Sequence, residues 1–226
     1  MNKRVEYIKG EQYLFKNEVL NNEEIAPEKY LLSFEKQFNF KAGNVVAITV
    51  NQAIAPRIYS ICSGENDQII QVLFDLNNTG ELTPKLANLK SGESLFVSKP
   101  YGSFLPKSET PMWWMATGTG IAPFRAMLRS GFVATKLIHG ARGASNFYFE
   151  REFKTTLKEN YIRCNSGADG LGDYFGRVTS WIETQTELPK HNKYYLCGRA
   201  LMVVEMRDLL ISKGIKYENI ISEIFF

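Results

Sequence analysis

The stretch Met112-Trp-Trp-Met-Ala-Thr-Gly-Thr-Gly-Ile-Ala-Pro-Phe124 restricts the fold of this chain more than any other segment. Its apolar beginning predicts a buried strand, and the two glycines that follow permit a tight turn. Pro123 suits the first turn of a helix, and Ile121, Phe124 and Leu128 repeat at helical spacing. A helix that begins at a glycine turn offers unpaired N–H groups and the positive end of its dipole to an anion. The stretch therefore predicts a site for the phosphates of a nucleotide.

The glycine spacing differs from that of the common dinucleotide fingerprint. That fingerprint has a third glycine and an acidic residue about 20 positions further on, and neither follows Gly120. Glycines also occur in ordinary turns between a strand and a helix, which is the alternative interpretation. If the turn binds phosphate, we expect a different type of dinucleotide-binding fold.

The first half of the chain has the pattern of a small antiparallel β-barrel. Strand-like runs cover residues 45–50, 57–62, 69–74 and 94–97, and turns rich in glycine and asparagine separate them. A short helix is expected over residues 83–89 within this half.

From Pro111 onward strands and helices alternate, which predicts a Rossmann-like α/β domain with a parallel sheet covered on both faces. Five strands are expected, over residues 112–116, 136–139, 161–164, 194–197 and 220–225. A helix is expected over residues 199–213. Because the segment 105–111 is polar and carries two prolines, we assign one domain to residues 1–107 and a second to residues 108–226.

Composition excludes several classes of protein. With 226 residues, 44% of them hydrophobic and 23% charged, the chain is expected to be globular. The net charge is only +3, and lysines alternate with glutamates, so nucleic-acid binding is disfavoured. No apolar run reaches the length of a membrane span and the first residues do not resemble a secretory signal, so we expect a cytoplasmic protein without membrane association. Three scattered cysteines and two separated histidines predict no metal site.

Five motifs, in order along nearly the whole chain, together resemble the ferredoxin–NADP reductase family. They are Arg57-x-Tyr-Ser60, Gly80-Glu-Leu-Thr-Pro84, Thr117-Gly-Thr-Gly-Ile-Ala-Pro-Phe-Arg125, Tyr195-Leu-Cys-Gly198 with Met202, and Glu223-Ile-Phe225. The resemblance implies that the barrel binds FAD and that the α/β domain binds NADP(H). FMN stays open as an alternative to FAD, because the pyrophosphate contacts follow only from the resemblance.

On the barrel, Arg57 and Tyr59 share one face of a strand, because alternate residues point the same way. The resemblance implies that Arg57 contacts the flavin phosphates, that Tyr59 packs on the isoalloxazine and that Ser60 bonds near N5. It also implies that Thr83 contacts the flavin pyrophosphate, while an N-terminal cap is an alternative role for this residue.

In the α/β domain, the resemblance implies that the glycine turn holds the pyrophosphate of the nicotinamide dinucleotide. The implied cofactor-binding residues are Gly118, Thr119, Gly120, Pro123, Gly198 and Met202. Cys197 would lie beside nicotinamide C4, whereas a small buried apolar residue is its alternative role.

The C-terminal residues match the terminal Glu-x-aromatic motif of the family, with one departure. Glu223 would lie near the path of the proton and hydride, and Phe225 would stack over the flavin. An additional Phe226 follows, so which phenylalanine stacks stays open, and both can equally be the apolar end of a strand. The catalytic residues implied by the resemblance are Ser60, Cys197, Glu223, Phe225 and Phe226.

The choice of nicotinamide cofactor depends on cations for a 2′-phosphate. Arg142 and Arg177 correspond to phosphate-binding arginines of bacterial family members. The Ser-Arg pair usual after the third strand is Ser166-Gly167 here, and Asp169 and Asp173 lie nearby. NADPH is favoured, and NADH stays open.

The resulting hypothesis is an FAD-dependent oxidoreductase that passes electrons between NADPH and a one-electron carrier such as ferredoxin or flavodoxin. The first alternative is an NADH-dependent diaphorase or oxygenase reductase of the same superfamily, similar to cytochrome b5 reductase. The second is a flavin-binding electron-transfer subunit of a larger complex, a class that generally carries an extra cysteine cluster near the C-terminus.

Overall fold

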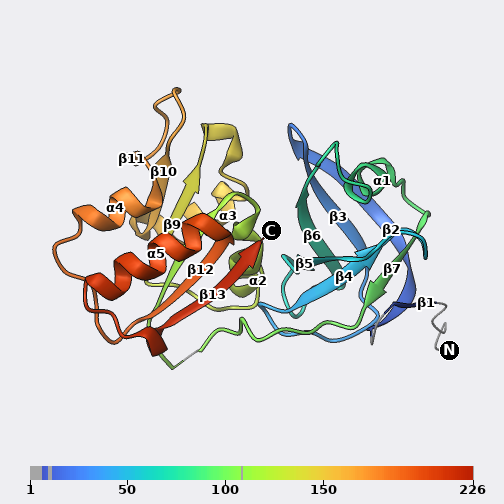
Figure 1. The fold of residues 1–226 in the computed structure, drawn as a ribbon, viewed down its shortest axis with the longest axis horizontal. Coiled ribbons are helices and arrows are strands. Elements are labelled where there is room, and N and C mark those ends of the chain that lie inside the picture. Colours follow the sequence, from blue (N-terminus) through green and yellow to red (C-terminus); the bar gives the residue numbers. More distant parts are fainter. Residues whose placement is uncertain (1–6, 10–11, 108, 226) are drawn as a thin grey trace. The chain divides into compact units, whose positions relative to one another are not determined.

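A computed structural model describes residues 7–9, 12–107 and 109–225 of the chain (Figure 1). The chain divides into two units, Met1–Leu105 and Pro106–Phe226. Each unit has its own sheet and its own hydrophobic core. Within the described residues, no helix is long and apolar enough to cross a lipid bilayer.

The first unit is built around an antiparallel sheet. Its elements are β1 (Tyr7–Lys9), β2 (Gln12–Ala26), β3 (Lys29–Glu35), β4 (Val45–Thr49), β5 (Arg57–Ser60), β6 (Ile69–Asp75), α1 (Thr83–Asn88) and β7 (Ser94–Ser98). The strands pair in the order β5-β4-β7-β2-β3-β6, and β1 pairs with β2. Beyond β5, Ile61 bridges to Val72 and Cys62 N–H donates to Gln71 O at 2.8 Å, which joins the two ends of this order. The predicted antiparallel barrel is confirmed.

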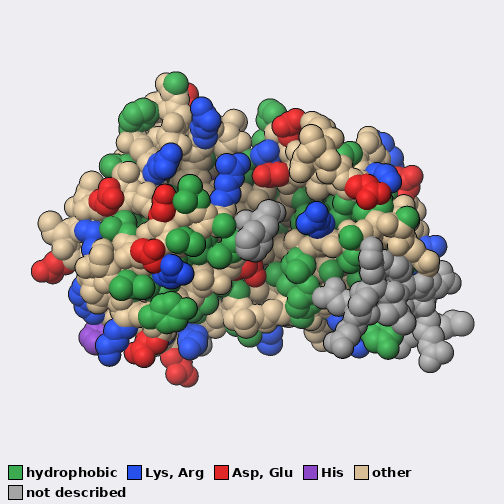
Figure 2. Space-filling view, viewed as in Figure 1, with side chains coloured by type: hydrophobic (Ala, Val, Ile, Leu, Met, Phe, Trp, Pro, Cys, Tyr) green, Lys and Arg blue, Asp and Glu red, His purple; other side chains and the backbone are tan. Residues whose placement is uncertain are grey.

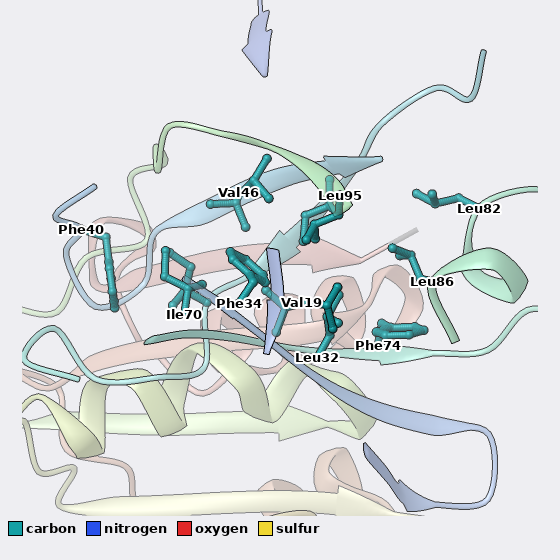
Figure 3. Close-up of a cluster of buried hydrophobic side chains, with 14 of the residues drawn as sticks. Val19, Leu32, Phe34, Phe40, Val46, Ile70, Phe74, Leu82, Leu86 and Leu95 are labelled. Atoms are coloured by element: carbon teal, nitrogen blue, oxygen red, sulfur yellow. The ribbon is translucent and has the colours of Figure 1, made fainter. Parts of the chain in front are cut away.

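The barrel encloses apolar side chains that come from every wall (Figure 3). They include Val19, Leu32, Phe34, Val46 and Leu95, each fully buried. Burying a side chain of this size contributes about 1.5–3 kcal/mol, so the interior holds the strands together. The short helix α1 is tied to the barrel by Asn22, whose Nδ2 donates to carbonyls at the end of that helix, including Leu86 O at 2.8 Å.

The second unit is a parallel sheet with helices on both faces. Its strands are β8 (Met112–Thr117), β9 (Lys136–Ala141), β10 (Tyr161–Asn165), β11 (Tyr174–Phe175), β12 (Lys193–Arg199) and β13 (Ile220–Phe225). Its helices are η1 (Gly118–Ile121), α2 (Ala122–Arg129), η2 (Ala144–Asn146), α3 (Glu150–Leu157), η3 (Lys158–Asn160), α4 (Val178–Thr184), α5 (Ala200–Ser212) and η4 (Tyr217–Asn219). The strands pair in the order β11-β10-β9-β8-β12-β13.

The sheet has six strands among the described residues, where the sequence predicts five. The five predicted strands are present, and β11 is added at one edge through pairing with Cys164 and Asn165. A strand of two residues is too short to show alternation, and Phe175 within it is exposed. No hydrophobic pattern therefore marks β11 in the sequence.

Helices lie on both faces of the sheet (Figure 1), and alternate residues of the central strand β8 pack against different helices. Trp113 and Met115 pack with α4 and α5 in one apolar cluster. On the other face, Trp114 stacks on Phe124 of α2 with ring centroids 5.4 Å apart. This three-layer arrangement confirms the predicted α/β class.

Charged side chains of both signs are interspersed over the displayed surface (Figure 2). This distribution agrees with the small net charge of +3. In the face shown by that view, basic side chains do not gather into one extended patch. The surface therefore lacks, on that face, the basic stripe typical of nucleic-acid binding.

Candidate functional site

The strand order reverses between β8 and β12. From β8 the chain adds β9, β10 and β11 on one side, and it returns to add β12 and β13 on the other. In open α/β sheets, ligands bind at the carboxyl ends of the strands where the order reverses. Here those ends carry Thr117 and Cys197, and Cys197 is paired with Ala116, the neighbour of Thr117. The predicted glycine turn thus begins at the reversal point.

The turn after β8 has a backbone that suits glycine. Thr117 is still extended, and Gly118 then has φ of +56°, a region that other residues rarely adopt. Helix η1 leads directly into α2, where Pro123 lies in the first turn. Among the described residues, no side chain hydrogen-bonds to the beginning of η1 or α2 as a cap. The N–H groups of this turn are therefore available to an anion.

Gly120 brings the turn into contact with the end of β12. A Cβ at this position would collide with the carbonyl oxygen of Cys197 and lie 2.7 Å from Gly198 Cα. Gly198 is equally confined, since a Cβ there would collide with Thr117 Oγ1 and lie 3.0 Å from Met202 Cε. The structure thus brings together residues from two motifs that are far apart in the sequence.

Cys197 and Glu223 face each other across neighbouring strands. They are paired in the register of β12 and β13, and Cys197 Sγ donates to Glu223 Oε2 at 3.9 Å. Cys197 is fully buried. Burial, reinforced by the charge of Glu223, holds the pKa of the Cys197 thiol well above its ordinary value. Cys197 is therefore a neutral thiol at physiological pH and not a thiolate nucleophile.

The last residues of the chain, at the end of β13, lie partly outside the described residues. Phe225 continues the strand opposite Arg199. The side chain of Phe225 and the whole of Phe226 lie outside the described residues. Which of the two phenylalanines stacks on a flavin therefore stays a prediction.

The two arginines expected at a 2′-phosphate follow strand ends near the glycine turn. A Cβ at Gly140 would lie 2.7 Å from Val178 Cγ1 and 3.0 Å from Thr117 Cγ2, so these residues are close neighbours. Arg142 follows Gly140 at the end of β9, and Arg177 directly precedes Val178 at the start of α4. Both arginines are exposed. In the strand order, β9, which precedes Arg142, lies on one side of β8, and β12, which carries Cys197, lies on the other side.

Asn165 organises the loop between β10 and β11. Its Oδ1 accepts from Gly143 N at 2.9 Å and Gly167 N at 2.8 Å, and its Nδ2 donates to Asp169 Oδ1 at 2.5 Å. Asp169 Oδ2 in turn accepts from Ala144 N at 2.7 Å. This network fixes the loop after β10 onto the turn that contains Arg142.

The second acidic residue of this loop has a different environment. Both carboxylate oxygens of Asp173 bind the Arg163 guanidinium, at 2.9 Å from Nε and 2.8 Å from Nη2. Arg163 also pairs with Glu150 through Nη1 at 2.6 Å. The pKa of Asp173 is held below its usual value, mainly by the bond from Arg163. Asp173 is therefore neutralised locally, whereas Asp169 is bound by N–H groups alone.

The predicted flavin residues of the barrel lie on the edge strand β5. Arg57 is exposed, Tyr59 is half-buried and packs edge-on against Phe74 at 6.1 Å between ring centroids, and Ser60 is buried. Burial raises the pKa of Tyr59, and the charge of Arg57 opposes this shift. Tyr59 is thus a neutral aromatic ring beside an exposed cation.

Thr83 has a role that differs from the N-terminal cap considered as an alternative. The residue that precedes α1 is Leu82, and it makes no side-chain cap. Thr83 Oγ1 instead accepts from Asn77 N at 2.9 Å and donates to Asn77 O at 3.1 Å. Thr83 therefore closes the turn before the helix, and a contact with phosphate remains a prediction.

Two buried hydroxyls near predicted cofactor residues were not assigned a role from the sequence, although the turn that carries Tyr101 was a candidate for approaching the flavin. Thr117 Oγ1 and Tyr101 Oη are buried and find no hydrogen-bond partner among the described residues. Tyr101 pairs with Val45, whose other neighbour in the sheet is Ser60. The sequence marks both residues only by position: Thr117 belongs to the glycine motif, and Tyr101 belongs to a Pro-Tyr-Gly-Ser turn. Each of these two hydroxyls lies near a predicted cofactor residue and has no hydrogen-bond partner in the part of the chain that the structure describes.

Arg125, within the glycine motif, fixes α2 to α3. Its Nη2 and Nε bind Glu152 Oε1 at 2.8 and 3.1 Å, and its guanidinium lies 4.0 Å from the centre of the Phe149 ring. The side chain is 8% exposed. A buried arginine needs an oppositely charged partner. The sequence alone does not identify Glu152 as that partner, because it lies 27 positions further along the chain.

Comparisons with known proteins agree with this architecture. Residues 114–208 match the oxidoreductase NAD-binding domain family. Ferredoxin–NADP reductase of Azotobacter vinelandii is 30% identical over 220 residues, which cover 82% of this chain and 85% of that protein. The electron transfer component of toluate 1,2-dioxygenase from Pseudomonas putida is 28% identical over 84% of this chain, and the match spans 60% of that protein.

A solved structure shows the same fold over almost its whole length. It is a ferredoxin NADP+ reductase from Neisseria gonorrhoeae with bound FAD and NADP, with a TM-score of 0.85 and 18% sequence identity. The similarity covers 94% of this chain and 99% of that chain. The 30% identity to the Azotobacter enzyme over most of both proteins shows that this chain belongs to the ferredoxin–NADP reductase family of oxidoreductases.

Proposed function

We propose that this protein is an FAD-dependent reductase that passes electrons between NADPH and a one-electron carrier such as ferredoxin or flavodoxin. The observation that carries the proposal is the contact of the Gly118–Gly120 turn with Cys197 and Gly198 at the point of strand-order reversal. A bound flavin supplies the chemistry, since it accepts a hydride and releases single electrons. The residues of the chain would bind and orient the two cofactors, and Cys197 and Glu223 would hold a proton between them.

The second unit fits a nicotinamide dinucleotide. The uncapped N–H groups after Gly118 can receive the pyrophosphate, and the buried Thr117 hydroxyl is a further group without a partner among the described residues. The missing Cβ atoms at Gly120 and Gly198 keep the backbone of both strand ends close together. Met202 lies beside Gly198, since a Cβ on Gly198 would be 3.0 Å from Met202 Cε. Cys197 would orient the nicotinamide as a neutral thiol whose proton is directed toward Glu223.

The barrel fits a flavin. Arg57 is an exposed cation for phosphate, Tyr59 offers a neutral ring for stacking, and Ser60 lies at the end of the same strand. The buried hydroxyl of Tyr101 supports the same location, because it has no partner among the described residues and lies across Val45 from Ser60. Thr83 would contribute to the pyrophosphate of FAD. An FMN cofactor would leave Thr83 unused.

Arg142 and Arg177 support NADPH as the cofactor, because each can bind a 2′-phosphate by charge-assisted hydrogen bonds. The experiment begins with the visible spectrum of the purified protein and the mass of the released flavin. Catalytic efficiency with NADPH and with NADH is then measured with ferricyanide, followed by reduction of ferredoxin and flavodoxin. A colourless protein that binds neither FAD nor FMN would overturn the proposal.

A second candidate is an NADH-dependent oxygenase reductase. Gly167 stands where an additional arginine would favour NADPH, and the carboxylate of Asp169 lies beside the turn that carries Arg142. The similarity to a dioxygenase electron transfer component points the same way. A catalytic efficiency that is higher with NADH, together with no transfer to ferredoxin or flavodoxin, would favour this candidate.

A further inference from the structure

Phe149, the residue before α3, has a backbone conformation that phenylalanine rarely adopts. Its φ is +59° and its ψ is +21°, in the left-handed region that disfavours a bulky side chain and that glycine or asparagine occupies more readily. The ring of Phe149 lies against the Arg125 guanidinium, whose Cζ is 4.0 Å from the ring centre. A residue held in an unfavourable conformation while it makes a specific contact indicates that the contact has a role.

The charge of Arg125 does not require this ring, because Glu152 already neutralises it. Both carboxylate oxygens of Glu152 bind Arg125 Nε at 3.1 Å, and Oε1 also binds Nη2 at 2.8 Å. The Glu152 N–H donates to Phe149 O at 3.0 Å, so the carboxylate and the ring belong to one turn of backbone. The carboxylate therefore neutralises the guanidinium, and the ring restricts where the guanidinium can lie.

Arg125 attaches this pair of contacts to the glycine turn. It lies in the first turn of α2, five residues after Gly120 in the same motif. Helix η1 leads from the turn into α2 without an intervening loop. Because a continuous helical segment moves as one piece, the position of Arg125 determines the position of the N–H groups proposed to receive the pyrophosphate.

Phe149 is connected in turn to Arg142, which is proposed to bind the 2′-phosphate. Asn146 Nδ2 donates to Arg142 O at 2.8 Å, and the hydroxyl of Tyr148 donates to Asn146 Oδ1 at 2.9 Å. Tyr148 is buried and directly precedes Phe149. A continuous series of contacts therefore joins the backbone of Arg142 to the guanidinium of Arg125.

We propose that the stack of Phe149 on Arg125 positions the Arg142 turn relative to the glycine turn, so that the 2′-phosphate and the pyrophosphate of one NADP(H) molecule bind at the same time. Two linked groups strengthen binding together only when the protein holds both of their sites at the matching separation. Phe149 is a positioning residue, since it acts through Arg125 and Arg142. The inference rests on the proposed dinucleotide function of this unit and concerns the spacing of its two phosphate subsites.

The test measures how much a second phosphate adds to the affinity of a nucleotide fragment. Isothermal titration of the purified full chain compares adenosine 2′-monophosphate, which carries only the 2′-phosphate, with 2′-phospho-AMP, which also carries the 5′-phosphate of the dinucleotide. The ratio of the two dissociation constants is the gain from engaging both subsites together. A loss of stability alone leaves this ratio unchanged, because it weakens both complexes equally.

Two variants remove the aromatic face in different ways. Phe149→Asn retains a residue suited to the left-handed conformation, and Phe149→Leu retains apolar volume. Each should reduce the gain about fivefold, within the range by which residues that couple two sites act, and should leave the affinity for adenosine 2′-monophosphate unchanged. Phe149→Tyr keeps the ring and should keep the gain. The control is Phe132→Asn, which removes another half-buried phenylalanine ring three residues beyond the end of α2 and should keep the gain.

Thermal melting identifies the variants that are folded at the titration temperature. If Phe149→Asn and Phe149→Leu keep the wild-type gain, the inference is wrong while the dinucleotide site stands. If they weaken both nucleotides equally, Phe149 supports only the Arg142 turn, and the inference is also wrong. An equal loss of the gain in Phe132→Asn would contradict a specific role for the stack. If the wild type binds neither nucleotide, the proposed site itself fails, and the inference fails with it.

Discussion

Gly120, three residues after the end of β8, lies against the backbone of Cys197 near the end of β12. No side chain larger than hydrogen fits at position 120, since a Cβ would lie 2.6 Å from the Cys197 carbonyl carbon. This contact sets the separation between the glycine turn and the residue expected beside the nicotinamide. Both the binding of a dinucleotide and the stability of the second unit should depend on it.

Gly120→Ala should therefore weaken NADP+ binding more than tenfold and lower the free energy of unfolding by about 1–3 kcal/mol, since the backbones must separate. Titration calorimetry and urea denaturation measure the two effects. Gly131→Ala is the control, because a Cβ at Gly131 meets nothing within 4 Å, although its φ of +91° imposes strain. Equal binding by both variants would contradict the assignment of the turn.

Cys197→Ser should slow hydride transfer by about tenfold to a hundredfold, because small displacements of a reacting group have large effects on rate. The affinity for NADPH should change little, since the pyrophosphate contacts remain. Stopped-flow reduction of the bound flavin measures the rate. Cys164→Ser serves as the control, because Cys164 is buried at the end of β10 and pairs with Gly140. An unchanged rate in Cys197→Ser would remove Cys197 from the catalytic residues.

Arg142→Ala should weaken NADPH binding by about 10- to 100-fold, the value of a lost charge-assisted hydrogen bond, and leave NADH binding unchanged. Equilibrium titrations of both cofactors give the comparison. Arg151→Ala is the matched control, because Arg151 is an exposed arginine on α3. A parallel loss of NADH affinity would show that Arg142 supports the fold of the turn and does not select the phosphate.

His139 should make the second unit sensitive to acid. The side chain is fully buried with Nδ1 2.9 Å from the Tyr161 hydroxyl, and burial lowers the pKa of His139 to about 3 from its ordinary 6.5. The unfolded chain therefore binds a proton that the folded chain does not, so stability is fully present above pH 6.5 and falls as the pH drops toward 3. The loss should approach about 1.4 kcal/mol per pH unit well below pH 6.5.

Urea denaturation at several pH values between 7.5 and 4 measures this slope. His139→Gln should be less stable at pH 7.5, since its amide must replace the bond to Tyr161, but its stability should fall less steeply with acid. His191→Gln provides the exposed-histidine comparison. If the unfolding free energy changes with pH equally in the wild type and in His139→Gln, His139 does not cause the loss of stability in acid.

Glu152→Gln should lower the free energy of unfolding by about 1–3 kcal/mol, because it leaves the Arg125 guanidinium buried with a weaker partner. Glu159→Gln is the control on the neighbouring exposed surface. A double-mutant cycle with Arg125→Met isolates the coupling between the two side chains. A coupling energy near zero would mean that the stacking on Phe149, and not the ion pair, holds Arg125.

The strands and the fold class were predictable because apolar runs report burial directly. β4 and β8 are continuous apolar runs in the sequence and are buried throughout nearly all their length. β11 was not predictable, since a strand of two residues is too short to show alternation and Phe175 is exposed. The helix α5 was predicted from its periodicity, and Met206 and Leu210 are buried as expected.

The arrangement of the candidate site depends on strand order, which no local pattern encodes. The sequence supplies Gly120 and Cys197, but their contact exists only because β12 inserts beside β8. The role of Thr83 depends in the same way on Asn77, because the turn between them brings the Asn77 N–H within hydrogen-bonding distance of the Thr83 hydroxyl. Residues whose meaning depends on a distant partner, such as Arg125, were therefore recognised only in the fold.

The reversal of strand order divides the proposed dinucleotide site between two stretches of chain that are separated by three strands and three α-helices. A chimaera that joins two related proteins anywhere between β9 and α4 would take Gly120 from one parent and Cys197 from the other. Each parent could contribute a sound strand and still produce a mismatched pair, since the contact leaves no room for adjustment. Recombination within this family should therefore succeed best when the crossover lies before β8, so that the complete second unit is inherited from a single parent.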